Sequence, residues 1–325
     1  MPNIRVHIVS KGINLPTMEC HSFFHSDYFF LLAEKIPGHK PYMVIAEDEN
    51  NRIIGHLLAL VRWHGSLFPP YLYSQGRIFG EGEYADGVNK EMVFGVILKE
   101  VTKLFKRNLV LYTEFSDISH KMFGYKNFRE NDYFPIGWQE IHNSLHNRLP
   151  ILQLTDKTRR QIRQSKQIGV ETKEATSSDE MQQYHKMLKK HFRTKFRRFI
   201  PNVELFQELQ KSNYGKTFIT IYKDKIIGGC TCVYSGNNAY LWFLGSKRKL
   251  YHHLHPGVLT IWYSIEYAFK KQFQHIYFLD AGLPFKKSSF REFILRFGGK
   301  PVTKYRWFRI TIPWVNKFLS WLFRE

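Results

Sequence analysis

The sequence predicts an α+β protein with two tandem domains, each a mixed twisted sheet flanked by helices. The chain has 325 residues, of which 43% are hydrophobic, enough for two packed cores. Segments of alternating apolar residues are interspersed with segments of helical period. One order of elements occurs twice: hairpin or meander, helix, strand, short helix, strand. We therefore expect domains at 1–150 and 151–325, meeting at "NRLPILQL".

The first half begins this plan with residues 41–64, two predicted strands around the turn "EDENNR". Acids and Asn favour such hairpin turns. A short strand broken by glycines follows, and residues 89–107 place apolar side chains around one helical face. Residues 108–116 predict a buried strand. A short helix capped by Ser116 or Asp117 and the strand "YFPIGWQEIHNS" complete the half.

The second half repeats the plan from a basic helix onward. Ser177 and the acids after it predict a capped helix start. Lys-Asp and Gly-Asn-Asn turns divide residues 216–246 into a three-stranded meander. Pro256 opens an apolar helix, and Gly298 or Gly299 ends the last one. The other expected ranges are helices at 157–168, 202–213, 256–273 and 288–299, and strands at 170–176, 275–282 and 302–312.

The net charge of +20 predicts attraction to an anionic partner: nucleic acid, nucleotide, anionic small molecule or lipid headgroup. Three cysteines are too few for a disulfide scaffold, which favours a reducing cytoplasm. Cys230 and Cys232 could be half of a metal site, but no second pair has zinc spacing, so we predict packing and no metal.

Neither a signal peptide nor a membrane-spanning helix is expected, because no apolar stretch is long enough. The C-terminus is different: Trp314, Phe318, Trp321 and Leu322 share one helical face. We expect this short helix to dock on its own domain through that face. The alternative is peripheral contact with the inner surface of a membrane.

Four segments of the second half resemble the GNAT acyltransferase superfamily, in particular its tandem FemA/FemB/FemX-like and CelD-type acetyltransferase branch. They are "TRRQIRQSKQIGVETKEA", "IGGCTCVYSGNNAYLWFLGS", "HPGVLTIWYSIEYAFKKQFQHIYFLDAG" and "FILRFGGKPV". The first half is similar only in plan. The resemblance implies two GNAT-like domains, acyl-CoA or aminoacyl-tRNA as donor, and no metal. Ile294 stands where the branch commonly has a lysine, which favours acyl-CoA.

The resemblance implies that the anionic donor binds where a strand leads into a helix, at residues 245–257. Basic side chains and a helix N-terminus attract phosphate there. The expected cofactor-binding residues are Lys247, Arg248, Lys249, Gly257 and Val258. The first half also contains a short match to the superfamily's glycine loop at Arg77–Gly82, with no helix directly after it.

Transfer to an amine needs a group that holds the amine and a base that takes its proton. Asp280 ends a strand and is the expected carboxylate, and His255 is the expected base, with His252 and His253 nearby. The alternative for Asp280 is a cap on the following turn. The expected substrate contacts are Tyr240, Trp242, Lys286, Arg291 and Arg296.

The densest positive charge lies in residues 157–200, with 13 Lys and Arg against 4 Asp and Glu. Residues 189–199 mix basic and aromatic side chains, a pattern that suits RNA or anionic lipid. The sequence thus predicts an intracellular N-acyltransferase acting on an amine of a cell-envelope or polysaccharide precursor, an anionic or lipid-linked molecule. The alternatives are an aminoacyltransferase using charged tRNA, and a non-catalytic module that binds RNA or a membrane surface. No oligomeric state is indicated.

Overall fold

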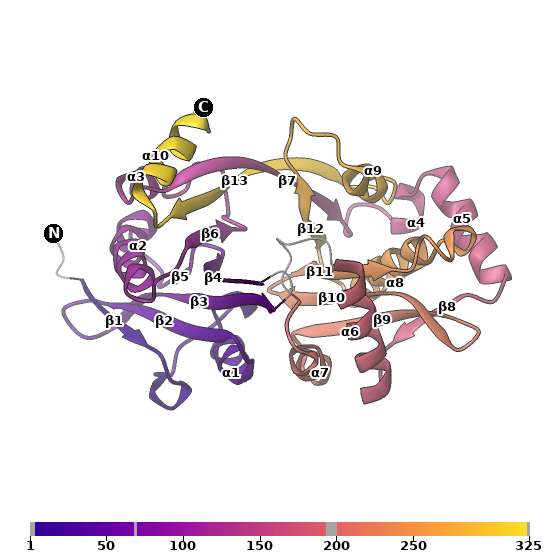
Figure 1. Cartoon of the computed structure of the whole chain (residues 1–325), viewed down its shortest axis with the longest axis horizontal. Coiled ribbons are helices and arrows are strands. Elements are labelled where there is room, and N and C mark those ends of the chain that lie inside the picture. The colour runs from indigo at the N-terminus through magenta and orange to yellow at the C-terminus, as the bar shows by residue number, and fades with distance from the viewer. Residues whose placement is uncertain (1–3, 68–69, 193–199, 324–325) are drawn as a thin grey trace. The chain divides into compact units, whose positions relative to one another are not determined.

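The computed structural model describes residues 4–67, 70–192 and 200–323 and divides into two compact units (Figure 1). The first unit is Met1–Trp138 with Thr303–Glu325, and the second is Gln139–Val302. These units differ from the contiguous halves 1–150 and 151–325, because the last strand of each half joins the sheet of the other unit. Strand β7 (Phe134–Ser144) pairs with β12 in the second unit, and β13 (Lys300–Ile310) pairs with β6 in the first.

The sheet of the first unit has the strand order β1-β2-β3-β4-β6-β13, with β5 beside β3. Its pairs are antiparallel except β4 and β6, which run parallel from Gln75↔Tyr112 to Phe79↔Ser116. Such a crossover needs a helix, and α2 supplies it. The elements are β1 (Arg5–Val9), α1 (Asp27–Lys35), β2 (His39–Glu47), β3 (Ile53–Leu67), β4 (Pro70–Phe79), β5 (Glu83–Tyr84), α2 (Lys90–Arg107), β6 (Tyr112–Ser116), α3 (Tyr125–Glu130) and α10 (Pro313–Leu322).

The core of the first unit lies between the sheet and α2. The Asn89 side chain caps α2 by accepting from the Met92 N–H (3.1 Å). Phe94 and Ile97 of α2 and Phe115 of β6 are fully buried in this core. The predicted hairpin of β2 and β3 is confirmed, whereas β1 and α1 have no counterpart among the predicted elements.

The sheet of the second unit has the order β7-β12-β11-β10-β9-β8. The meander predicted over residues 216–246 is confirmed as β9, β10 and β11, and α8 connects β11 to the parallel strand β12. The elements are α4 (Pro150–Gln153), α5 (Asp156–Gln167), β8 (Glu171–Glu174), α6 (Ser178–Phe192), α7 (Val203–Lys211), β9 (Gly215–Tyr222), β10 (Lys225–Ser235), β11 (Asn238–Ser246), α8 (Pro256–Lys270), β12 (His275–Gly282) and α9 (Ser289–Leu295).

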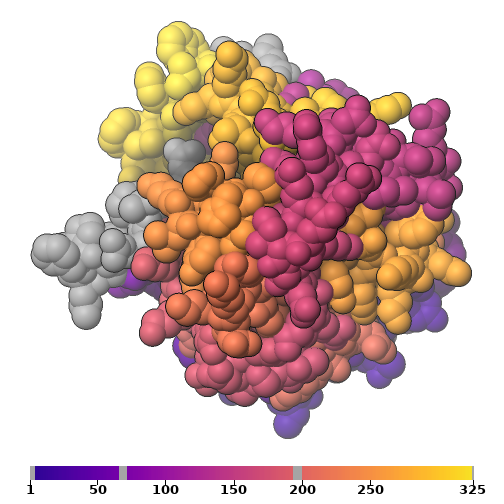
Figure 2. Space-filling model, turned by 90° about the vertical axis from the view of Figure 1, so that its right-hand side faces the viewer, coloured from indigo at the N-terminus to yellow at the C-terminus, as the bar shows by residue number. Residues whose placement is uncertain are grey.

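Helix α8 contributes the largest share of this unit's core, with Ile261 and Ile265 fully buried. Helix α5 lies against its start, where the Ser165 Oγ donates to the Leu254 carbonyl (2.9 Å). Figure 2 faces this unit and shows the magenta segment that includes α5 lying on the orange surface. Cys230 and Cys232 are buried free thiols in the same core, which confirms that they pack.

The C-terminal helix α10 corrects one expectation. Its apolar face does not dock on its own unit, because Trp314, Phe318 and Trp321 are all exposed. The basic and aromatic stretch 189–199 is described only up to Phe192, and residues 193–199 lie outside the described part of the chain. Among the described residues, no helix has the length and hydropathy to cross a membrane.

Candidate active site

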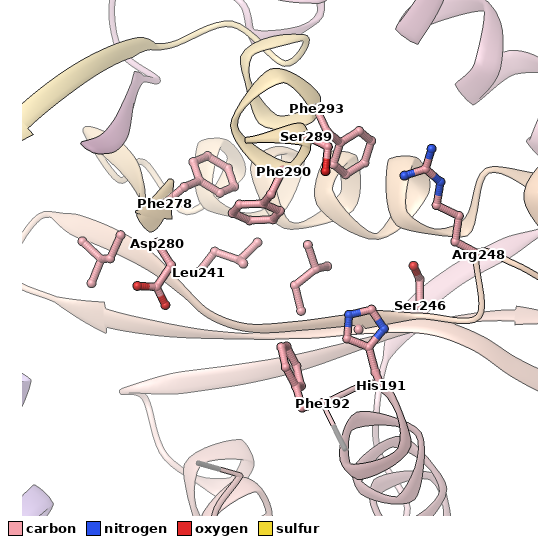
Figure 3. Close-up of a pocket in the computed structure, with 13 residues that line it drawn as sticks. His191, Phe192, Leu241, Ser246, Arg248, Phe278, Asp280, Ser289, Phe290 and Phe293 are labelled. Atoms are coloured by element: carbon pink, nitrogen blue, oxygen red, sulfur yellow. The ribbon is translucent and has the colours of Figure 1, made fainter. Parts of the chain in front are cut away.

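A pocket of about 330 Å³ opens in the second unit where β11 and β12 separate (Figure 3). The parallel register of the two strands covers Asn238↔His275 to Tyr240↔Tyr277 and ends there. Beyond Tyr240 and Tyr277 both strands line the pocket instead, through Leu241, Leu244, Gly245 and Ser246 on β11 and Phe278, Leu279 and Asp280 on β12. Splayed strands expose backbone N–H and C=O groups that a bound molecule can use.

Asp280 enters the pocket from an irregular segment of β12. The strand advances from Phe278 to Gly282 while its partner β7 advances only from Ile141 to Gln139. Such a bulge interrupts the alternation of the strand and can turn one side chain toward a site. The Asp280 carboxylate lies toward one end of the pocket, and Ser246 and Arg248 lie toward the other (Figure 3).

A second bulge, on β11, decides which of its side chains face the pocket. Thr231 of β10 pairs with Phe243 and Cys232 with Leu241, so Trp242 is an extra residue. The expected substrate residue Trp242 does not line the pocket, whereas Leu241 and Leu244 both do. Tyr240, another expected substrate residue, occupies the last paired position, with its ring against Tyr277 (5.2 Å between centroids).

Two helices form the walls of the pocket. Helix α6 contributes His191 and Phe192 at its C-terminal end, and α9 contributes Ser289, Phe290 and Phe293. Gly245 allows α6 to approach β11, since a Cβ there would lie 2.8 Å from the Leu188 Cδ2. The lining is therefore mainly aromatic and aliphatic, with a few polar groups, which is typical of a small-molecule site.

Positive charge gathers at the Ser246 end of the pocket. Arg248 lines it, and Gly257 borders it, with an added Cβ 3.5 Å from the Ser246 Oγ and 3.6 Å from the Phe293 ring. Burial lowers the pKa of Lys247, and the like charges of Lys190 and Lys225 lower it further. An anion bound beside Lys247 would offset the like charges around it.

The other residues expected at the donor lie differently. Val258 is buried in the core. Its N–H donates to the His255 carbonyl (2.9 Å) and therefore already has an acceptor within the chain. Lys249 is exposed outside the pocket lining. His255 caps α8 in a left-handed conformation (φ 45°), near the Gln161 side chain (3.5 Å), and burial followed by the charges of His252 and His253 lowers its pKa. The structure does not bring His255 to the pocket.

Three expected substrate residues lie on or beside α9 without lining the pocket. Arg291 binds the preceding loop, donating to the carbonyls of Leu283 (2.9 Å) and Lys286 (2.8 Å). The Lys286 side chain is exposed, and Arg296 ends α9, its carbonyl accepting from the Thr155 N–H (3.0 Å). Ile294 is fully buried, so a charged residue at that position would have to enter the core of this unit.

Sequence reasoning missed His191, Ser289 and the phenylalanines of the pocket. Phe290 and Phe293 have the spacing of one helical face, which is the signal that could have indicated them. Nothing in the sequence separates His191 from the lysines around it. The described residues contain no group of three or more His, Cys, Asp or Glu that could hold a metal ion.

Residues 155–287 match the family profile of an acetyltransferase (GNAT) domain. The chain carries a GNAT acyltransferase domain. The matched region includes Asp280, Arg248 and His191, and it ends before α9. No curated protein matches the chain.

Solved structures agree on a tandem GNAT-like fold for the whole chain. FemX aligns with a TM-score of 0.62 at 8% identity, over 95% of this chain and 96% of FemX. L-PGS from Bacillus licheniformis aligns at 0.58 and 10% identity, over 91% and 93% of the two chains. A tandem GNAT protein from the clavulanic acid biosynthesis pathway aligns at 0.57 and 9% identity, over 88% of each. Identities this low establish the fold alone.

The first GNAT-like unit lacks the strand separation seen in the second. Its parallel strands β4 and β6 stay paired from Gln75 to Phe79, and Arg77 is buried against Glu114 (2.5 Å). The short glycine-loop match at 77–82 therefore begins inside a closed sheet, and α2 starts only at Lys90. This geometry does not suit a phosphate loop, which needs a helix N-terminus directly after its glycines.

Proposed function

We propose that the protein is an N-acyltransferase that moves an acyl group from acyl-CoA to an amine of a cell-envelope or polysaccharide precursor. The observation that carries the proposal is the pocket at the separation of β11 and β12, with a carboxylate toward one end and an arginine toward the other. This arrangement suits a donor with anionic phosphates at Arg248 and an amine at Asp280.

The reaction joins the amine nitrogen of the acceptor to the carbonyl carbon of the thioester. The C–S bond then breaks, and the coenzyme leaves as a thiol after taking up a proton. In our proposal Asp280 holds the acceptor amine and receives the proton that the nitrogen loses. Backbone groups of β11 beyond Tyr240 stabilise the carbonyl oxygen as it becomes negative.

His191 is a second group that can serve the proton transfer, and it lines the same pocket from α6. The expected base His255 caps α8 away from the pocket lining, so it is better suited to positioning the loop that carries Arg248. The aromatic lining excludes water from the thioester, which limits its hydrolysis.

An aminoacyl-tRNA donor is the second candidate, and the lysine cluster favours it. Burial and then the charges of Lys190 and Lys225 lower the pKa of Lys247, and tRNA phosphates would neutralise this group of three lysines. The fold likeness to FemX and L-PGS is compatible with either donor.

The test measures thiol release from a panel of acyl-CoA donors and amine acceptors, and in parallel the transfer of labelled amino acid from charged tRNA. We expect thiol release, and Asp280→Asn should lower kcat about 10²- to 10⁴-fold with little change in donor binding. Glu292→Gln, an exposed carboxylate on α9, is the matched control and should retain full activity. Turnover with charged tRNA and none with acyl-CoA would show that aminoacyl-tRNA is the donor. Full activity of Asp280→Asn would refute the role proposed for Asp280.

A further inference from the structure

The C-terminal helix α10 presents its aromatic side chains to solvent. Trp314 is 73% exposed, Phe318 55% and Trp321 63%, and Leu322 beside them is exposed as well. These residues lie at helical spacing, so they form one continuous face. Large aromatic groups gathered on one exposed face usually mark an interaction surface.

The polar side of α10 fixes this orientation. Asn316 is buried, donates to the Asp132 carbonyl (2.9 Å) and accepts from the Ile310 N–H (2.7 Å). Arg129 of α3 donates to the Ser320 Oγ (3.3 Å). A surface helix normally buries its apolar face. Here the inward side carries these hydrogen bonds and the half-buried Val315, Leu319 and Phe323, and the side with both tryptophans is left outward.

The apolar surface continues beyond α10 onto the connection between α2 and β6. Leu109 and Leu111 are exposed there, and the Thr311 N–H donates to the Leu111 carbonyl (2.9 Å), which joins this connection to the start of α10. We call Leu109, Leu111, Ile312, Trp314, Phe318, Trp321 and Leu322 the aromatic patch.

Basic residues border the aromatic patch. Lys106 and Arg107 end α2, and the Leu109 N–H donates to the Lys106 carbonyl (3.1 Å), so both lie next to the patch. Lys317 is exposed on α10 itself, whose described residues carry no acid. The patch therefore combines apolar area with positive charge.

We propose that the aromatic patch binds the surface of an anionic lipid bilayer, with α10 lying in the plane of the interface. Tryptophan and phenylalanine enter the boundary between headgroups and acyl chains, and nearby Lys and Arg are attracted to an anionic surface. A second copy of the chain is a poorer occupant, because it would bring Lys106, Arg107 and Lys317 against like charges. The proposal does not depend on the acyltransferase function.

The experiment is co-sedimentation of the full chain with vesicles of phosphatidylcholine alone and of phosphatidylcholine mixed equally with phosphatidylglycerol. We expect salt-sensitive binding to the mixed vesicles. The triple variant Trp314→Ser, Phe318→Ser and Trp321→Ser should bind at least about tenfold more weakly, since it loses most of the apolar area. Its unfolding temperature should stay close to that of the native chain, because these side chains are exposed.

Trp63→Ser is the matched control, since Trp63 is 43% exposed on β3 outside the patch, and it should bind vesicles like the native chain. Equal binding by the triple variant and the native chain would overturn the proposal. The absence of vesicle binding by the native chain would also overturn the proposal. That outcome includes the case in which sedimentation velocity shows a dimer of the native chain that the triple variant does not form.

Discussion

Glu114 is the carboxylate that faces two buried arginines in the first unit. Its Oε1 lies 2.5 Å from the Arg77 Nη1 and 3.3 Å from the Arg306 Nη1, and Gln75 donates to its Oε2 (3.1 Å). Both arginines are less than 10% exposed. Glu114 thus takes part in two buried ion pairs, whose members are costly to bury without an opposite charge.

We expect Glu114→Gln to lower the free energy of unfolding by about 3–5 kcal/mol, because it removes the acidic member of two buried ion pairs. Denaturant titration followed by circular dichroism measures this change. Glu100→Gln removes the exposed ion pair with Lys103 (2.6 Å) and should change stability by less than about 1 kcal/mol. Similar losses in the two variants would contradict the role given to Glu114.

Individual site residues were predictable to different extents. Asp280 lies near the end of β12 and Arg248 just after the end of β11, and both line the pocket as their places in the sequence suggested. Trp242 could not be assigned, because one extra residue in β11 reverses the alternation that sequence reasoning assumes. His191 reaches the pocket only through the packing of α6 on Gly245, a contact between residues far apart in the chain.

At the scale of elements, α6 begins with the reciprocal cap that the sequence predicted. Glu180 accepts from the N–H groups of Thr176 (2.9 Å) and Ser177 (3.2 Å), and the Glu180 N–H donates to the Ser177 Oγ (3.1 Å). Burial would raise the pKa of Glu180. The ion pair with Lys173 and the two backbone donors outweigh it and hold the pKa at about 2.

This cap predicts a pH-dependent stability. The folded pKa of Glu180 lies below the ordinary glutamate pKa of 4.5, so its contribution to stability is complete above that pH and is lost as the pH falls toward 2. For a partly exposed carboxylate in a helix cap we expect a contribution of about 1 kcal/mol. Glu180→Gln keeps the hydrogen-bonding shape without titrating.

The measurement is the unfolding free energy of the native chain and of Glu180→Gln at several pH values. The difference between them should grow from acid pH to pH 5 and then stay constant. A difference that is the same at every pH would show that Glu180 does not titrate as described.

At the scale of the whole molecule, the strands β7 and β13 are exchanged between the two units. Their existence was predicted from alternating apolar residues, but their partners were not, because strand pairing over more than 100 residues leaves no local signal. The repeated plan indicated two domains. It could not indicate that Gln139–Ser144 pairs with β12, more than 130 residues later in the chain.

The exchange predicts how fragments behave. A fragment of residues 139–302 keeps the part of β7 that pairs with β12 and all of β8 to β12. The fragment 151–302 leaves the edge of β12 uncovered at Ile276 and Phe278, both buried in the intact chain. We expect the longer fragment to give dispersed amide signals in NMR spectra and the shorter one to aggregate. If both fragments fold equally well, β7 is dispensable to its sheet.

The order in which the ribosome makes the strands has a consequence for biogenesis. The second sheet has all its strands once residue 282 has been synthesised. Its strands are β7 to β12, and β12, the last of them in the chain, ends at Gly282. The first sheet, although begun earlier, waits for Trp307–Ile310 to cover the edge of β6. The nascent N-terminal portion thus carries an open edge at β6 until β13 has been synthesised, so termination before β13 would release a product prone to self-association.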